Sequence, residues 1–413
     1  MTIEKDRKGA SRRRFIAAAG AASLTLAAPA IVRGQGRQAL KVSVGRQPWA
    51  AGNSPVTQYM IANKTYERYA ADAGYDLTID YRDYPSALPM VEAFVSSNLD
   101  FGMWGNTPIV RLIGQNQPIQ MITVGEGHFR FVLATRKDSP IRNLADLKGK
   151  TVGALLGGDP YNVLSQWLRF ELGNPDPRAF DITVVNTPTQ AQAATIPTGM
   201  DAAVLIYPAF LQANSQLGIV GIMNSFGYTE SHYKGPAGEG AGILLPSVKK
   251  SPFYPDGYYL HRSFWISNST IIKNHPAVVT AFALAQQDAV AKLSAMDPGA
   301  VSQLSRKYWE LDPKLGAKVV EDEVLFKRGW CWPTEGDALA LLETSKFMVE
   351  GRMIPKPLAW AQVRESFALA APSVRAAYDK SGHKPDAAQF EAHDAKDLRG
   401  PPAWEMQRWR EHS

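Results

Sequence analysis

The sequence is poor in cysteine and in the motifs of metal and nucleophile chemistry. Cys331 is the single cysteine in 413 residues, which excludes a disulfide framework, a cysteine-rich zinc site and a cysteine-ligated iron–sulfur cluster. The seven histidines include no H-E-x-x-H or H-x-x-x-H spacing, and no G-x-S-x-G nucleophile elbow is present. We therefore expect no metal, no cofactor and no enzymatic activity.

The net positive charge is also small outside the first 30 residues. The formal net charge is +6, but residues 1–30 hold six Lys and Arg against two acidic residues, so they carry +4 and leave +2 on the rest. No basic cluster with interleaved aromatic residues appears later, so the charge pattern predicts no nucleic-acid partner. The 45% hydrophobic and 20% charged residues are typical of a globular protein and exclude a disordered, collagen-like or coiled-coil chain.

The N-terminus has the pattern of an export signal. Residues 11–16 (SRRRFI) contain a twin arginine, residues 17–28 form an apolar run, and residues 28–30 (APA) supply a cleavage site. The run is shorter than the roughly 20 residues that a membrane span needs. Residues 1–30 thus resemble a twin-arginine signal peptide, read by the twin-arginine translocase. No cysteine follows the cleavage site, so a soluble periplasmic protein without a lipid anchor is expected. The alternative is an arginine-rich helix of a cytoplasmic protein.

From Leu40 onward, short apolar runs alternate with amphipathic stretches, which is the pattern of an α/β protein. Residues 40–44 and 77–81 are predicted strands, and residues 55–71 a predicted helix. The chain becomes helical after about residue 268. Residues 372–413 are polar with little periodicity, and we interpret them as a surface wrap or a partly disordered tail.

One helix–strand–helix unit recurs about 100 residues later. The strand predicted at residues 101–104 is followed by Pro108, and the strand predicted at residues 202–206 by Pro208. Proline favours the first turn of a helix, so each copy aims a helix N-terminus at the carboxyl end of a strand, where open α/β sheets bind ligands. The repeat indicates two similar lobes, although such units also recur by chance in α/β proteins.

Five segments resemble a known family in its order along the chain. They are residues 102–108 (GMWGNTP), 146–153 (DLKGKTVG), 205–209 (LIYPA), 264–267 (FWIS) and 274–276 (NHP). Over about residues 39–350 the chain is similar to ABC transporter solute-binding proteins of the nitrate/taurine/aliphatic-sulfonate type. The resemblance implies a type 2 periplasmic binding protein fold, in which two α/β lobes are joined by a two-strand hinge. It places lobe one at residues 39–134 plus 268–413, with a helical C-terminal extension, and lobe two at residues 135–260.

The resemblance also implies a set of ligand contacts in the cleft between the lobes. They belong to the loop after the first strand, to the two strand–helix turns, to the lobe-two loop and to the hinge: Gln47, Pro48, Trp49, Trp104, Asn106, Thr107, Asp159, Tyr161, Asn162, Tyr207, His261 and Arg262. Core packing is the alternative role for the aromatic residues, and helix capping for Asn106 and Thr107.

Two of these positions depart from the family pattern. Asn106 stands where Ser or Thr is usual, and Asp159 stands in a loop where sulfonate-type members tend to carry Ser, Thr or His. A carboxylate facing the cleft repels an anion and suits an amine or a hydroxyl. Alternatively, Asp159 caps the helix that begins at Pro160.

The function implied is capture of a small organic solute (a sulfonate, an aromatic carboxylate or a zwitterion) by hinge closure, and its delivery to an ABC importer permease in the inner membrane. An enzyme on the same fold, similar to pyrimidine-precursor synthases, is the rival interpretation, but their Cys-rich motif is missing. A ligand sensor for a membrane receptor is the third.

Overall fold

The computed structural model describes residues 36–225, 234–235, 238–239, 262–392 and 398–413. The predicted signal peptide and His261 lie outside these residues. The chain from Arg37 to Ser413 is one compact unit, and two five-stranded sheets organise it. We call the elements around the first sheet the first lobe, and those around the second sheet the second lobe.

The first sheet has the order β2-β1-β3-β12-β4. β1 pairs in parallel with β2 and β3, whereas β12 runs antiparallel between β3 and β4. The strands are β1 (Gln38–Arg46), β2 (Tyr75–Asp83), β3 (Phe101–Gly105), β4 (Ile119–Glu126) and β12 (Ser263–Asn268).

The second sheet repeats this topology in the order β7-β6-β8-β5-β9. β6 pairs in parallel with β7 and β8, and β5 runs antiparallel between β8 and β9. The strands are β5 (Phe131–Thr135), β6 (Thr151–Ala154), β7 (Thr183–Asn186), β8 (Ala202–Ile206) and β9 (Val220–Asn224), and a two-stranded hairpin adds β10 (Lys234–Gly235) and β11 (Gly238–Glu239). β3 and β8, which belong to the recurring unit of the sequence, hold equivalent places in the two sheets.

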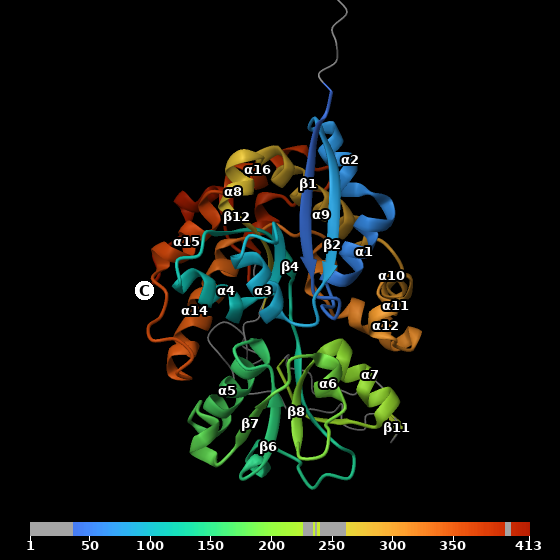
Figure 1. Cartoon of the computed structure of the whole chain (residues 1–413), viewed down its shortest axis with the longest axis vertical. Coiled ribbons are helices and arrows are strands. Elements are labelled where there is room, and N and C mark those ends of the chain that lie inside the picture. Colours follow the sequence, from blue (N-terminus) through green and yellow to red (C-terminus); the bar gives the residue numbers. More distant parts are fainter. Residues whose placement is uncertain (1–35, 226–233, 236–237, 240–261, 393–397) are drawn as a thin grey trace, which may run out of the picture. The chain divides into compact units, whose positions relative to one another are not determined.

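Helices connect and cover the strands (Figure 1). They are α1 (Asn53–Asn63), α2 (Thr65–Asp72), α3 (Ala87–Val95), α4 (Asn106–Gly114), η1 (Leu144–Leu147), α5 (Asp159–Leu172), η2 (Pro177–Phe180), α6 (Gln190–Ala194), α7 (Tyr207–Leu217), α8 (Ser269–Asn274), α9 (Pro276–Ser294), α10 (Pro298–Leu304), α11 (Arg306–Trp309), α12 (Pro313–Glu321), α13 (Val324–Arg328), α14 (Glu335–Glu350), α15 (Trp360–Ala368), α16 (Ala371–Lys380), α17 (Ala387–Glu391) and η3 (Ala403–Arg408). Within the part of the chain described, no helix is both long enough and apolar enough to cross a bilayer.

The predicted elements differ from the observed ones in two instructive places. The single helix expected over residues 55–71 is divided into α1 and α2, because Lys64 adopts a left-handed conformation with φ 48°. The described part of the polar tail, residues 372–392 and 398–413, is folded and contains helical segments. Phe390 and Trp409 are buried, and the Trp409 ring lies 5.7 Å from that of Trp360. A few widely spaced aromatic residues anchor this tail although its average composition is polar.

The chain crosses between the sheets twice. It leaves the first sheet after β4 and enters the second at β5, through residues 127–130, and it returns between β9 and β12. The chain therefore changes sheet a few residues before the lobe boundary that the resemblance placed between residues 134 and 135. The other limits of the two lobes remain predictions.

Both faces of the first sheet are covered by apolar side chains. On one face Phe101 stacks on Phe282 of α9 with 4.6 Å between ring centroids. On the other, Trp104 packs edge-on against Phe94 at 5.2 Å. Gly102 makes room for this indole, because a Cβ at Gly102 would stand 2.2 Å from the Trp104 ring.

We predict that Gly102→Ala destabilises the protein, because the added methyl group overlaps the fully buried Trp104 ring, which must shift. The free energy of unfolding should fall by about 1–3 kcal/mol, as in other overpacked cores. Urea denaturation measures this. Gly382→Ala is the matched control, since a Cβ there meets nothing within 4 Å, and an equal loss in both variants would contradict the prediction.

Candidate functional site

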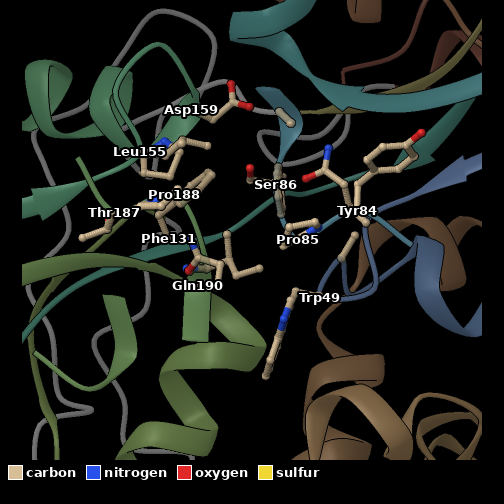
Figure 2. A pocket seen from close by; sticks show the side chains of 16 residues that line it. Trp49, Tyr84, Pro85, Ser86, Phe131, Leu155, Asp159, Thr187, Pro188 and Gln190 are labelled. Atoms are coloured by element: carbon tan, nitrogen blue, oxygen red, sulfur yellow. The ribbon is translucent and has the colours of Figure 1, made fainter. Parts of the chain in front are cut away.

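A small cavity of about 40 Å³ lies where strands of both sheets end. A volume of this size accommodates a few water-sized groups. The lining comes from elements of both lobes (Figure 2): Gln47, Trp49, Ala50, Tyr84, Pro85, Ser86, Ala87, Phe129, Phe131, Leu155, Asp159, Pro160, Thr187, Pro188, Gln190 and Ile206.

The lining residues follow from where the parallel strands end. Gln47 and Trp49 come directly after β1, and Tyr84 directly after β2. Leu155 follows β6 and Thr187 follows β7 in the same way in the second lobe. The carboxyl ends of parallel strands are where open α/β sheets bind ligands, so this cavity is the candidate ligand site.

Asp159 is the acidic residue of the cavity, and it connects the two lobes. Its Oδ1 accepts a hydrogen bond of 2.8 Å from the backbone N–H of Thr107, in the first turn of α4. Asn162 Nδ2 donates to Thr107 Oγ1 at 2.9 Å, one turn along α5. The first N–H groups of a helix have no partner within it. The second lobe thus supplies the acceptor that caps α4, and Asp159 caps this helix rather than α5, whose N-cap is Gly158.

The local sequence explains how Asp159 reaches α4. Gly157 has φ +81°, a left-handed conformation that favours glycine, and a Cβ on it would stand 3.0 Å from Nη1 of Arg111. The Gly157–Gly158 pair therefore lets the loop turn tightly beside the guanidinium group of α4.

Burial controls the proton affinity of Asp159. The side chain is 4% exposed, and desolvation raises its pKa to about 7, against the lowering effect of the Thr107 hydrogen bonds and the Arg111 charge. Burial also lowers the pKa of Arg111, which Asp159 counteracts. The fold thus favours the neutral form of Asp159 more than water does.

This shift predicts a pH dependence of stability. Because the pKa of Asp159 rises from an unfolded value near 3.8 to about 7, its contribution is fully present below pH 4 and is lost as the pH rises through 7. Between pH 5 and pH 8, wild type should therefore lose about 3 kcal/mol of unfolding free energy relative to Asp159→Asn, which cannot ionise. Urea denaturation of both proteins at the two pH values measures this, and a difference of opposite sign would contradict it.

Three of the predicted contacts line the cavity, namely Gln47, Trp49 and Asp159. Gln47 Nε2 donates to the Met103 carbonyl oxygen at 2.8 Å, which fixes the loop after β1 to β3. Pro48 belongs to the same loop but lies outside the lining, and its carbonyl oxygen accepts from the Trp309 indole N–H at 3.2 Å.

Other predicted contacts have structural partners away from the cavity. Trp104 is in the core, where its indole N–H donates to the Ala87 carbonyl oxygen at 3.3 Å. Asn106 Nδ2 donates to Thr344 Oγ1 of α14 at 2.9 Å, and its Oδ1 accepts from the Arg262 N–H at 3.3 Å. Thr344 of α14, far away in sequence, thus holds the Asn106 side chain away from the cavity.

Tyr161 and Tyr207 also lie outside the lining. Tyr161 is half-buried on α5, and burial is the main reason that its pKa is raised. Tyr207 is buried at the start of α7, with the Arg130 guanidinium 4.0 Å from its ring centroid. Tyr207 thus packs against the segment that joins the two sheets.

Sequence reasoning missed the residues that follow β2 and β7, chiefly Tyr84, Ser86, Thr187 and Gln190. The rule applied to β1, β3 and β8 also holds for these strands, so the carboxyl ends of β2 and β7 were the available signal. Ser86 is 7% exposed and is the N-cap of α3, yet its hydroxyl makes no capping bond to that helix.

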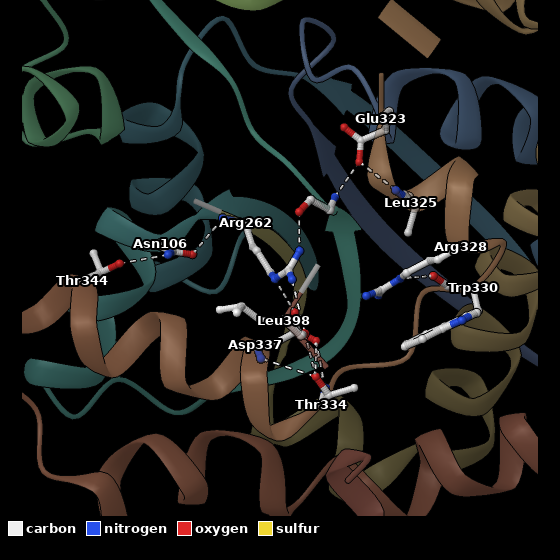
Figure 3. A network of polar contacts seen from close by, with 11 residues as sticks. Asn106, Arg262, Glu323, Leu325, Arg328, Trp330, Thr334, Asp337, Thr344 and Leu398 are labelled. Atoms are coloured by element: carbon white, nitrogen blue, oxygen red, sulfur yellow. Dashed lines mark hydrogen bonds and ion pairs between the residues drawn. The ribbon is translucent and has the colours of Figure 1, made fainter. Parts of the chain in front are cut away.

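Buried carboxylates and one arginine organise the crossing between the lobes (Figure 3). Glu323 Oε1 accepts from the Gly127 and Leu325 N–H groups at 2.7 and 3.1 Å. Glu126 Oε1 accepts from the Ala51 N–H at 3.0 Å, in the loop that carries Trp49. Burial is the main reason that the pKa values of both glutamates are raised.

Arg262 ties the returning strand to the C-terminal extension. Its Nε lies 2.5 Å from Asp337 Oδ1 of α14, in a pair that is almost fully buried. Its guanidinium also donates to the carbonyl oxygens of Gly127 and Leu398 (Figure 3). Arg262 therefore holds the two crossings together rather than lining the cavity.

We predict that Arg262→Met costs about 3–5 kcal/mol of unfolding free energy, because it leaves the Asp337 carboxylate buried without the guanidinium that neutralises it. Chemical denaturation measures the loss. Arg169→Gln is the control, because Arg169 pairs with Glu350 at a site where both side chains are almost half exposed. The control should cost less than about 1 kcal/mol, and similar losses in both variants would contradict the assignment.

Among the described residues, no group of three or more His, Cys, Asp or Glu side chains could hold a metal ion. Cys331 is buried, and its Sγ lies 3.5 Å from Gln287 Oε1. The described lining of the cavity combines aromatic rings, prolines, aliphatic side chains and a few uncharged polar groups with the carboxyl group of Asp159.

Solved structures share this architecture. The periplasmic aliphatic sulphonate binding protein SsuA from Escherichia coli aligns with a TM-score of 0.54 and 16% identity over 79% of this chain and 91% of its own. The periplasmic nitrate-binding protein NrtA from Synechocystis gives 0.55 and 12% over 86% and 91%. The alkanesulfonate-binding protein SsuA from Xanthomonas axonopodis pv. citri, bound to MOPS, gives 0.54 and 15% over 81% and 97%. The fold is therefore that of the periplasmic binding proteins.

A model of the family described as NMT1/THI5 like matches residues 65–298. The chain belongs to this family. No curated protein matches the sequence. The resemblance to nitrate- and sulfonate-type solute-binding proteins and the fold that it implied are confirmed, whereas the twin-arginine signal stays a prediction.

Proposed function

We propose that this protein is a periplasmic solute-binding protein that captures a small organic solute between its two lobes and delivers it to an ABC importer permease. The observation that carries the proposal is the cavity, which residues following strands of both sheets enclose. A site divided in this way is complete only when the lobes close, so ligand binding favours the closed conformation.

The chemistry of the cavity supports binding rather than catalysis. Trp49, Tyr84, Phe129 and Phe131 provide apolar aromatic surface for an organic solute. Burial raises the pKa of the Cys331 thiol to about 12, so this cysteine is not an activated nucleophile.

Export supports the same role. The twin arginine and apolar run of residues 1–30 resemble a signal for the twin-arginine translocase. A soluble protein exported in this way meets solutes that have entered the periplasm. An importer permease in the inner membrane would then be the partner that recognises the closed, loaded form.

The ligand contacts proposed on the basis of position are Gln47, Trp49 and Asp159, which line the cavity, with Thr107 and Asn162 holding Asp159. Pro48, Trp104, Asn106, Tyr161, Tyr207 and Arg262 are proposed as supporting residues. His261 lies outside the described residues and keeps only its sequence-based assignment to the hinge.

A fluorescence titration tests solute binding. Purified protein is titrated with sulfonates, aromatic carboxylates, zwitterions and pyrimidines, and we expect a binding solute to change the tryptophan emission because Trp49 lines the cavity. Trp49→Phe should abolish most of this change. Trp404→Phe, at a half-buried tryptophan of the C-terminal tail, should retain it.

The same solute should stabilise the protein by about 2.7 kcal/mol at 100 times its Kd. If no solute changes the emission or the melting temperature, the proposal is wrong. If mass spectrometry shows that a bound pyrimidine is converted, the enzyme interpretation replaces it. Capture of the loaded protein by a membrane receptor, instead of a permease, would favour the sensor interpretation.

A further inference from the structure

The second lobe places its own carboxyl group at the N-terminus of α4. Asp159 Oδ1 accepts from the Thr107 N–H at 2.8 Å, so the position that could hold an oxyanion of a ligand is taken by the protein itself. Thr107 is fully buried and Asp159 nearly so. A ligand oxyanion at this point would need to displace Asp159 from α4 and would then face a like charge at short range.

The charges around Asp159 favour a positively charged partner. Arg111, one turn further along α4, is a cation among the described residues whose charge acts on Asp159, and burial raises the pKa of the carboxyl group despite it. Thr107 and Asn162, from the two helices that meet here, are uncharged. A ligand cation next to Asp159 would therefore gain a buried counter-charge.

The walls of the same cavity suit a cation as well. Trp49, Tyr84, Phe129 and Phe131 present aromatic rings, whose faces attract ammonium groups, more strongly where water is excluded. No Lys or Arg side chain is among the described residues that line the cavity. Among these described lining residues, Asp159 supplies the carboxyl group that an entering anion meets.

We propose that Asp159 replaces the acid group of a ligand at α4 and that the cleft selects small organic solutes with a protonated amine, rejecting simple oxyanions such as alkyl sulfonates. This ligand class rests on the proposed solute-binding function. It differs from the binding of a sulfonate at α4, because the Asp159 carboxyl group already accepts the Thr107 N–H there.

Two pairs of probes with matched carbon skeletons test the ligand class. Ethylammonium is compared with ethanesulfonate, and benzylammonium with benzenesulfonate, at equal ionic strength and pH 8. We expect the ammonium member of at least one pair to raise the melting temperature of the wild-type protein, and neither sulfonate to do so. Isothermal titration then gives the Kd values.

Two variants of Asp159 assign the selectivity to this residue. Asp159→Asn removes the charge and keeps the shape, so the Kd for the ammonium probe should rise about 30-fold or more, as when one partner of a buried charged pair is removed. Asp159→Ser shortens the side chain and frees the Thr107 N–H, so this variant should acquire binding of the matched sulfonate. Circular dichroism confirms that both variants are folded.

Asp138→Asn is the matched control. It makes the same change of charge at an exposed residue of the second lobe, outside the cavity lining, and should leave both Kd values unchanged.

The outcomes separate the two proposals. If sulfonates stabilise wild type and the ammonium probes do not, or if Asp159→Asn retains the ammonium affinity, the ligand class is overturned while solute binding stands. If only neutral solutes change the Trp49 emission, the ligand class is likewise wrong. If neither these probes nor the wider solute panel bind to wild type or variants, both proposals are contradicted.

Discussion

The structure depends on satisfying backbone N–H groups where the chain passes between two sheets and water is excluded. Glu323 accepts from Gly127 and Leu325, and Glu126 accepts from Ala51. Because an unsatisfied buried N–H is strongly destabilising, these carboxyl groups fix the crossing, the loop after β1 and the start of α13 to one another. The position of Trp49 in the cavity therefore follows from hydrogen bonds made at the hinge.

The backbone N–H groups at the start of α4 also need an acceptor, and Asp159 of the second lobe supplies it. This places a carboxyl group in the cleft. A helix N-terminus normally finds its acceptor in a neighbouring side chain or a ligand. Here Asp159 reaches it across the interface, so a bond that stabilises the closed arrangement also sets the charge that a ligand meets. Stability and selectivity are thus coupled through one carboxyl group.

The sequence predicted the elements with strong local signals and missed those that tertiary contacts decide. The strand over residues 202–206 and the helix after it were predicted correctly because the run is wholly apolar and Pro208 marks the turn. β7 was missed because its four residues are only half-buried or exposed and show no strong alternation. One partner of Asn106, Thr344, lies 238 residues away on α14, a separation at which local pattern carries no information. The role of Asp159 likewise depended on its contact with α4.

Helices of the C-terminal extension contact both lobes, and this has a kinetic consequence. The Phe347 ring of α14 lies 5.4 Å from that of Phe170 on α5, and Glu310, directly after α11, accepts a hydrogen bond of 3.1 Å from Gln212 of α7. Each of these contacts joins a helix of the second lobe to a segment outside it, so separating the lobes breaks them. If a solute enters only when such contacts are broken, its association rate follows how often the lobes separate rather than how fast the solute diffuses.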